Sequence, residues 1–420
     1  MVAHRVSTSF FLVAFTATVL HAQVLGDLAR TEMGVGARAL ALGNNYSALA
    51  NDPSSLFWNP AGITFAKRNN FQLSFGGLRV ENRVEFRPGN TVSISESEIS
   101  RVQAGNAAYV HNFSIGNDAA FGIAYQNPYA FDAVLGYAGT SAAGNTAVAV
   151  DNWYHSIGRL DFWTGGFGIR IIPEIAVGLA VSLVTGHSAD KLEFLKTTNG
   201  EVADPVNDYY LDDLSRDYCG YDARLGLRFR PSDYLALGMR IEFPSYIGFS
   251  EWVSEVLPAA PDESYSYAMD GHLSTGYSGA IGGAFTTRYT VITGEVTARA
   301  PDPGAFETEP QHYWKIGAGA GIEIPFIMEC LSLRGGYAWK EYAPYPYRVH
   351  YDGYTESENC EKSNSFNGEH MISAGIGYTV ADMVSLELAA SHRLYELSTA
   401  SVLDEKHQSQ RVLGSIGIVF

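Results

Sequence analysis

The stretch GEHMISAGIGYTVADMVSLELAASHRLYE, residues 368–396, alternates apolar and polar side chains on both sides of a two-residue break, Ala381-Asp382. The apolar positions are Ile372, Ala374, Ile376, Tyr378 and Val380 before the break, then Val384, Leu386 and Leu388 after it. Alternation with a period of two is typical of β-strands that have one apolar and one wetted face. The stretch therefore predicts a β-hairpin with a very short turn.

The same pattern recurs along the chain and predicts fourteen strands. We place them at residues 68–80, 101–113, 118–128, 158–170, 174–185, 219–230, 233–244, 272–286, 289–300, 311–324, 330–340, 368–380, 383–396 and 409–420. Connections within pairs are tiny, such as Pro231-Ser232 and Thr287-Arg288. Connections between pairs are long: 81–100, 129–157, 186–218, 245–271, 301–310, 341–367 and 397–408.

Short turns that alternate with long loops are typical of outer-membrane barrels, and an even strand count closes the sheet without a free edge. A soluble β-sandwich or propeller has no reason to alternate loop length in this way. The predicted fold is therefore an all-β, fourteen-stranded antiparallel transmembrane β-barrel over residues 68–420. Composition agrees, with 43 Gly, 25 Tyr, 22 Phe and only 17% charged residues, since small residues and aromatic girdles suit membrane strands.

The two ends of the sequence indicate export to a bacterial outer membrane. His4 and Arg5 precede an apolar run at 10–20, which predicts a signal peptide over residues 1–22. The last residues alternate and end on Phe420, which resembles the signal that barrel-assembly machinery recognises. We expect contact with outer-membrane lipid and lipopolysaccharide, and a monomer. The net charge of −17 argues against nucleic acid as a partner, because there is no basic stripe to neutralise phosphates.

Residues 23–67 break the alternation and read as short helical turns rich in Ala, Gly and Asn. A fourteen-strand barrel has a lumen too wide for wall side chains alone to fill. We therefore predict that residues 23–67 form a hatch inside the barrel. Within it, Asn59, Pro60 and Ala61 form a stiff turn, because Pro60 biases Asn59 toward an extended conformation and Asn59 can bond local backbone.

The hatch also carries a family resemblance. Its segments GARALALG at 36–43 and LANDPSSLFWNPAG at 49–62 resemble the opening of the FadL/TodX superfamily, which includes the related PorV/PorQ group. The resemblance implies a fourteen-strand barrel whose hatch bears an Asn-Pro-Ala motif, here Asn59, Pro60 and Ala61. In transport members, hatch movement opens a sideways route for long-chain fatty acids or aromatic hydrocarbons. These three residues are the candidate gate, with a purely structural turn as the alternative.

Alternation also points a set of charged side chains into the lumen. The candidate lumen-lining residues are Arg224, Arg228, Arg240, Glu242, Arg299, Lys315, Glu323, Arg334, Glu387 and Arg393. Charges in a barrel interior normally pair across strands or bond a plug, and we prefer that reading to a substrate ladder. An apolar cargo then needs a local pocket, for which loop aromatics such as Trp252, Tyr265, Tyr267 and the tyrosines of 341–367 are candidates.

The sequence shows no HExxH, GxSxG or phosphate-loop motif, and Cys219, Cys330 and Cys360 form no metal-binding spacing. We therefore expect no enzyme and no cofactor. Two functions stay open. The first is a passive, hatch-gated transporter for hydrophobic small molecules. The second is a PorV-like barrel that serves protein secretion or surface attachment with secretion-system partners, while a narrow pore for polar solutes is less favoured.

Overall fold

The computed structural model describes residues 31–66, 68–87, 92–103, 105–143, 146–204, 206–300, 314–326, 330–341, 348–351, 364–366, 368–399 and 403–420. The predicted signal peptide and hatch residues 23–30 lie outside the described residues. So do the loop 301–310 and most of the loop 341–367.

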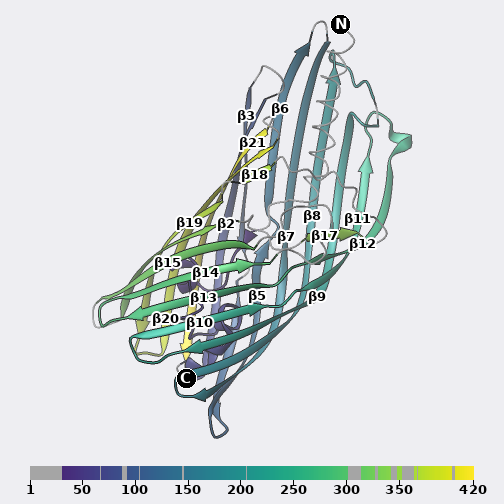
Figure 1. Ribbon diagram of the computed structural model, residues 1–420. Helices are drawn as coiled ribbons and strands as arrows, with labels where there is room; N and C mark the ends of the chain where they lie inside the picture. The colour runs from purple at the N-terminus through teal and green to yellow at the C-terminus, as the bar shows by residue number, and fades with distance from the viewer. Residues whose placement is uncertain are drawn as a thin grey trace.

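The chain forms a closed antiparallel β-barrel of fourteen wall strands, which confirms the predicted fold (Figure 1). The uninterrupted strands are β2 (Asn70–Phe86), β7 (Thr146–Ile172), β8 (Ile175–Thr198), β9 (Tyr209–Phe229), β14 (Val291–Arg299), β15 (Lys315–Phe326), β16 (Leu331–Lys340), β19 (Glu369–Val380), β20 (Val384–Thr399) and β21 (Leu403–Val419). Each of the others is broken into two segments: β3 (Ser93–Gln103) with β4 (Ala107–Ser114), β5 (Asp118–Ala130) with β6 (Ala133–Ala143), β10 (Leu235–Glu242) with β11 (Tyr246–Val256), and β12 (Tyr265–Ser274) with β13 (Ser278–Thr286).

The first and last wall strands close the ring. β2 and β21 pair from Asn70↔Val419 to Phe86↔Leu403. The remaining elements are small: β1 (Thr31–Glu32), α2 (Ala37–Ala41), α3 (Ser55–Trp58), the 3-10 turns η1 (Pro60–Phe65) and η2 (Pro261–Glu263), β17 (Arg348–Tyr351) and β18 (Asn364–Phe366). Of these, α2, α3 and η1 belong to the hatch segment.

An apolar band surrounds the lower part of the wall. On β7 the outward side chains Trp163, Phe167 and Ile171 are exposed, and Asp161 and Arg159 follow on the same face nearer the loops. An outward apolar band bordered by aromatic and charged residues is the lipid-facing surface of a transmembrane barrel. Among the described residues, no helix is long and apolar enough to cross a membrane.

Several strands continue well beyond this band, and here the predicted strand ends were wrong. β7, β8 and β9 run through much of the stretches predicted as loops at 129–157 and 186–218. The tall strands in Figure 1 show this extension. Most outward residues at this height are polar, such as the Lys191–Asp213 pair at 3.2 Å. The outward apolar signal therefore fades, while the backbone ladder that defines the strand continues.

The third wall strand bends between β5 and β6, and β6 packs against inward residues of β2 such as Val84 and Phe86. The β5–β7 register shifts between Gln126 and Tyr129, and β6 then continues the ladder with β7. Residues 133–135 of β6 are buried in succession, so both faces of the strand are covered. A Cβ on Gly136 would lie 2.9 Å from Ser97 Oγ of β3, but no ladder joins β3 to β6 within the described residues. We call this unbonded contact between β3 and β6 the seam.

Candidate functional site: the hatch and the lumen

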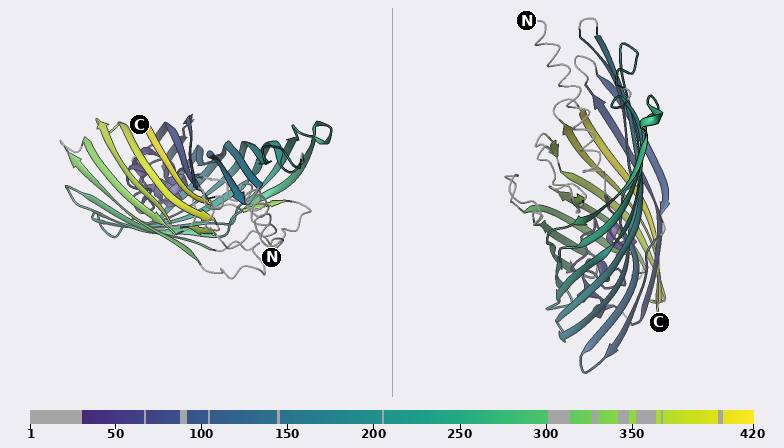
Figure 2. Two further views of the ribbon diagram at one scale, coloured as in Figure 1. Left: turned by 90° about the horizontal axis from the view of Figure 1, so that it is seen from above. Right: turned by 90° about the vertical axis from the view of Figure 1, so that its right-hand side faces the viewer.

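The hatch fills the lower lumen. Seen from above, the purple hatch lies between the yellow strands and the teal strands (Figure 2). Its side chains Leu42, Tyr46, Leu56, Phe57 and Trp58 are almost wholly buried. The indole of Trp58 donates to the carbonyl of Val35 at 2.7 Å and so ties the end of α3 to the start of the hatch. Residues 33–66 of the predicted hatch, which the structure describes, therefore form a packed plug.

The Asn59-Pro60-Ala61 turn is fixed from both sides. Asn59 has an extended backbone (φ −168°, ψ 100°), as its position before proline predicts. Its amide donates to Ser47 O at 2.8 Å and to Leu227 O of the wall at 3.0 Å. Its Oδ1 accepts from Ala61 N at 3.2 Å. The three candidate gate residues thus form a buried clamp between two parts of the hatch and strand β9.

Glycines of the wall let the hatch backbone come close. A Cβ on Gly178 of β8 would lie 2.4 Å from the carbonyl carbon of Pro60, and one on Gly336 of β16 would lie 2.2 Å from Gly43 N. Real Cβ atoms essentially never come so close to backbone. Any side chain at these positions would lift the hatch from the wall. The hatch therefore rests on a seat that the glycines provide on opposite strands.

One group of predicted lumen residues forms an ion-pair network with the hatch. Glu323 accepts from Arg38 of α2 at 2.9 Å and from Arg334 at 2.7 Å. Arg334 also pairs with Glu387 at 3.3 Å. All four side chains are largely buried, so the network compensates charges that would be costly alone. This agrees with the preferred reading that interior charges bond a plug.

A second group binds the other end of the hatch. Arg228 donates to Ala50 O at 2.5 Å, and Arg240 donates to Trp58 O at 3.5 Å. The Arg224 guanidinium lies 4.2 Å from the ring centroid of Phe57, a cation–π arrangement. Glu242 lies 3.1 Å from Arg240 and 3.4 Å from Arg224.

The remaining predicted residues do not join these groups. Arg393 pairs with Glu369 at 3.6 Å. Arg299 and Lys315 are directly opposite each other on β14 and β15, and Lys315 is exposed. They share the inward parity of the other lumen residues. Their assignment as lumen-lining residues of functional importance stays a prediction.

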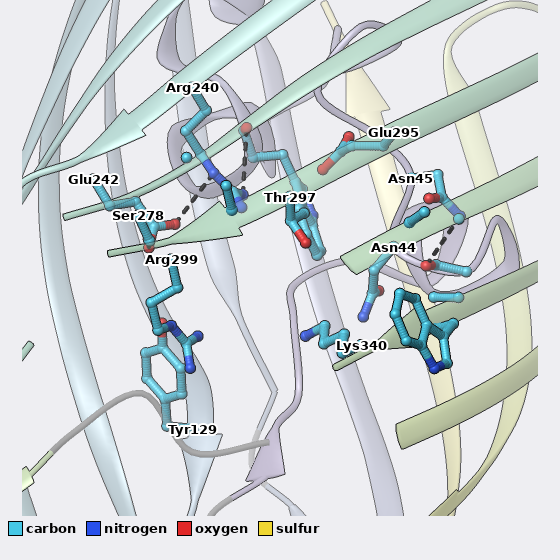
Figure 3. A pocket seen from close by; sticks show the side chains of 18 residues that line it. Asn44, Asn45, Tyr129, Arg240, Glu242, Ser278, Glu295, Thr297, Arg299 and Lys340 are labelled. Atoms are coloured by element: carbon cyan, nitrogen blue, oxygen red, sulfur yellow. Dashed lines mark hydrogen bonds and ion pairs between the residues drawn. The ribbon is translucent and has the colours of Figure 1, made fainter. Parts of the chain in front are cut away.

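A polar cavity lies between the hatch and β10, β13, β14 and β16. Arg240, Thr297 and Lys340 gather around one space, with Asn44 of the hatch beside them (Figure 3). Its volume is about 40 Å³, which suits a few water molecules, whereas benzene needs a cavity of roughly 150 Å³. This cavity therefore suits water and is too small for an aromatic cargo.

An apolar cluster lies higher on the inner face, above the hatch. It contains the buried residues Tyr129, Phe131, Leu160, Phe162, Val184, Tyr218, Ile247, Phe249 and Leu273, and we call it the aromatic cluster. Phe131 and Tyr218 have ring centroids 5.2 Å apart, and Tyr129 and Phe162 5.7 Å. Its members come from β5, β7, β8, β9, β11 and β12 and from the 131–132 break.

The aromatic cluster was not predicted from the sequence, which instead indicated an apolar pocket formed by aromatic residues of the loops. Trp252 faces outward and is 55% exposed, and Tyr265 and Tyr267 are also exposed, so these three form no pocket. Most tyrosines of 341–367 lie outside the described residues. Part of the signal was available in the predicted strand 158–170, where Leu160 and Phe162 lie two residues apart on one face. Ile247 and Phe249 lie in the stretch predicted as the loop 245–271, so their inward direction was not predicted.

Comparison with known proteins shows which solved structures share this architecture. No protein-family model and no curated protein sequence matches the chain. Solved structures do match. The Pseudomonas putida toluene transporter TodX is 15% identical, with a TM-score of 0.62, over 93% of this chain and 99% of that one. The monoaromatic hydrocarbon channel CymD is 12% identical, with a TM-score of 0.58, over 93% and 98%. A Pseudomonas aeruginosa FadL homologue is 13% identical, with a TM-score of 0.55, over 92% and 97%.

The fold and the hatch define a bacterial outer-membrane β-barrel with an internal plug. More particularly, the chain has the fold of the FadL/TodX channels, as the hatch motif predicted. The three solved structures are described as a transporter, a channel and a FadL homologue, and none is described as an enzyme. The prediction of a non-enzymatic barrel agrees with this.

Proposed function

We propose that this protein is a passive outer-membrane channel for hydrophobic small molecules. The aromatic cluster carries the proposal, because it is a buried apolar surface on the inner face of the barrel and lies next to the seam. TodX and CymD, which share the fold, are described as a toluene transporter and a monoaromatic hydrocarbon channel. A wet lumen offers an apolar molecule no favourable path, whereas aromatic side chains supply one.

The path then turns sideways instead of passing through the hatch. Asn59, the glycine seat and the ion-pair network hold residues 37–65 to the wall at many points, and each hydrogen bond contributes on the order of 1 kcal/mol. Moving the whole hatch would break most of these contacts together. Opening the seam breaks fewer hydrogen bonds than moving the hatch, because β3 and β6 are joined there by side-chain packing without a backbone ladder.

The first hatch residues cover the lower end of the seam. Met33 N donates to Pro128 O at 2.6 Å, and Thr31 and Glu32 pair with Ala130 and Tyr129 of β5. This short ladder is the movable part of the hatch in our proposal. Asn59, Pro60 and Ala61 hold the fixed part, so they affect transport by keeping the rest of the plug in place.

Arg101 of β3 fastens the seam. Its Nε donates to Asp132 at 2.8 Å and its NH2 group donates to Gly158 O at 3.0 Å. Asp132 is buried, and Phe131 N donates to the same Gly158 carbonyl at 2.9 Å. One guanidinium therefore joins the second, third and fourth wall strands at the point where the ladder fails.

The test is uptake into liposomes that contain the purified barrel. We expect protein-dependent entry of labelled toluene and no protein-dependent entry of glucose. Entry of glucose without toluene would refute the proposal and favour a polar pore. Arg101→Ala should raise toluene entry, because the seam loses its charged fastening.

A role in protein secretion or surface attachment is a second candidate. It is favoured by Trp252, whose ring is exposed on the outward face of β11 at the height where the wall has turned polar, beside the Ser250–Asp270 hydrogen bond of 2.8 Å. Co-purification of a secretion component that is lost in Trp252→Ser would support it. If the same component co-purifies equally with Trp252→Ser, the exposed Trp252 gives no support to a secretion role.

A further inference from the structure

Gln126 occupies the inner face of β5 at the position where the wall register shifts. It pairs with Phe162 of the aromatic cluster across the ladder, and directly paired residues point to the same face. Two residues earlier, Ala124 packs in the apolar cluster that contains Leu56 of the hatch. Gln126 therefore lies between the hatch and the aromatic cluster, beside the lower end of the seam.

The Gln126 carboxamide is buried and lacks hydrogen-bond partners in the part of the chain that the structure describes. The residue is 0% exposed. Neither Nε2 nor Oε1 has a hydrogen-bond partner among the described residues. In the neighbouring Asn127 the amide nitrogen is satisfied, since Nδ2 donates to the Tyr125 hydroxyl and to Asp161. Each buried polar atom left without a hydrogen bond lowers the folding equilibrium constant by roughly fivefold to a hundredfold. Two unpaired amide atoms at this position therefore point to a ligand.

We infer that the Gln126 carboxamide is a hydrogen-bonding subsite for the cargo, and that it favours hydrophobic molecules carrying one neutral hydroxyl group, such as phenols. The inference rests on the proposed transport function. A hydroxyl both donates and accepts, so it can satisfy Oε1 and Nε2 together. The ring of such a molecule matches the adjacent Phe162, Tyr129 and Phe131.

Other cargo chemistries fit this position less well. A plain hydrocarbon leaves both amide atoms unpaired. A carboxylate can accept from Nε2 but cannot donate to Oε1, so it leaves one of the two amide atoms unpaired. The subsite therefore separates phenols from both hydrocarbons and fatty-acid anions.

The test compares p-cresol with p-xylene, which differ by a hydroxyl in place of a methyl group. Their rates of protein-dependent entry into liposomes are measured for the wild type, Gln126→Leu and Gln126→Met, each corrected for protein-free liposomes. We expect the cresol-to-xylene ratio to fall at least about fivefold in both variants, as the loss of the two hydrogen bonds between hydroxyl and carboxamide predicts. Taking the ratio cancels differences in the amount of protein inserted.

Thr164→Val is the matched control. Thr164 lies on the same inner face, opposite Ala124, but its hydroxyl is hydrogen-bonded to Ser182 at 2.8 Å. This variant should keep the wild-type ratio. An unchanged ratio in both Gln126 variants, with both solutes still entering, would overturn the subsite and indicate a bound water only. Entry of neither solute through the wild type would instead refute the proposed transport function.

Discussion

Replacing Asn59 with alanine should release the hatch while leaving the barrel intact. The side chain is fully buried and makes three hydrogen bonds: to Ser47 O at 2.8 Å, to Leu227 O at 3.0 Å and from Ala61 N at 3.2 Å. Removing one partner of a buried hydrogen bond costs about 1–3 kcal/mol, and effects within one side chain are less than additive. We therefore expect hatch docking to weaken by about 2–4 kcal/mol.

The assay is hydrogen exchange of backbone amides in the detergent-solubilised full chain. Tenfold in an equilibrium corresponds to about 1.4 kcal/mol, so hatch amides at 37–64 should exchange roughly 30- to 700-fold faster than in the wild type. Amides of the β2–β21 ladder should be unchanged, because their bonds do not involve the hatch.

The control is Asn44→Gly, also in the hatch. The buried Oδ1 of Asn44 has no hydrogen-bond partner among the described residues, and the φ of 62° at this position suits glycine. This variant should keep wild-type protection. Hatch protection in Asn59→Ala within threefold of the wild type would show that the clamp does not hold the plug.

Two further substitutions test the seat and the ion-pair network. Gly178→Val should prevent stable hatch docking, because its Cβ would lie 2.4 Å from the Pro60 backbone, whereas Gly165→Val should be tolerated because nothing lies within 4 Å of that Cβ; raised ion conductance in planar bilayers for the first alone is the expected readout. Glu323→Gln leaves the buried guanidiniums of Arg38 and Arg334 with less compensation, so hatch docking should weaken by about 3 kcal/mol. Unchanged hydrogen exchange of the hatch amides in this variant would show that Glu387 compensates the charges of both Arg38 and Arg334.

The wall was predictable because its signal is local and repeated. Alternation along residues 368–396 arises because one face of each strand contacts lipid and the other faces the lumen. In the structure this stretch forms the hairpin of β19 and β20. The hatch was predictable because Asn59-Pro60 fixes a turn through its own backbone, and the observed extended Asn59 agrees. Strand length was not predictable, because above the lipid the outward side chains turn polar while the ladder continues.

The seam and the aromatic cluster were missed for a different reason. The bend at 131–132 depends on Arg101 reaching Asp132 and Gly158 from another strand, and a single sequence does not show such pairs. Inward residues such as Phe162 and Phe249 are separated by many positions and form a cluster only when the barrel closes. The charged lumen residues were easier to recognise in the sequence. In the structure, however, Arg228 and Glu323 bind the hatch and do not line an apolar route.

The lateral seam is the central claim, and a reversible staple across it is the most direct test. Ser97→Cys with Gly136→Cys places two thiols across the seam, since a Cβ on Gly136 lies 2.9 Å from Ser97 Oγ and disulfides need Cβ atoms about 3.5–4.5 Å apart. The native Cys219, Cys330 and Cys360 would be replaced by serine. The protein-dependent part of toluene entry into liposomes, after subtraction of entry into protein-free liposomes, should be lost when the pair is oxidised and return when it is reduced. Equal entry in the oxidised and reduced states would contradict the account, because a fastened seam would then have no effect on the route.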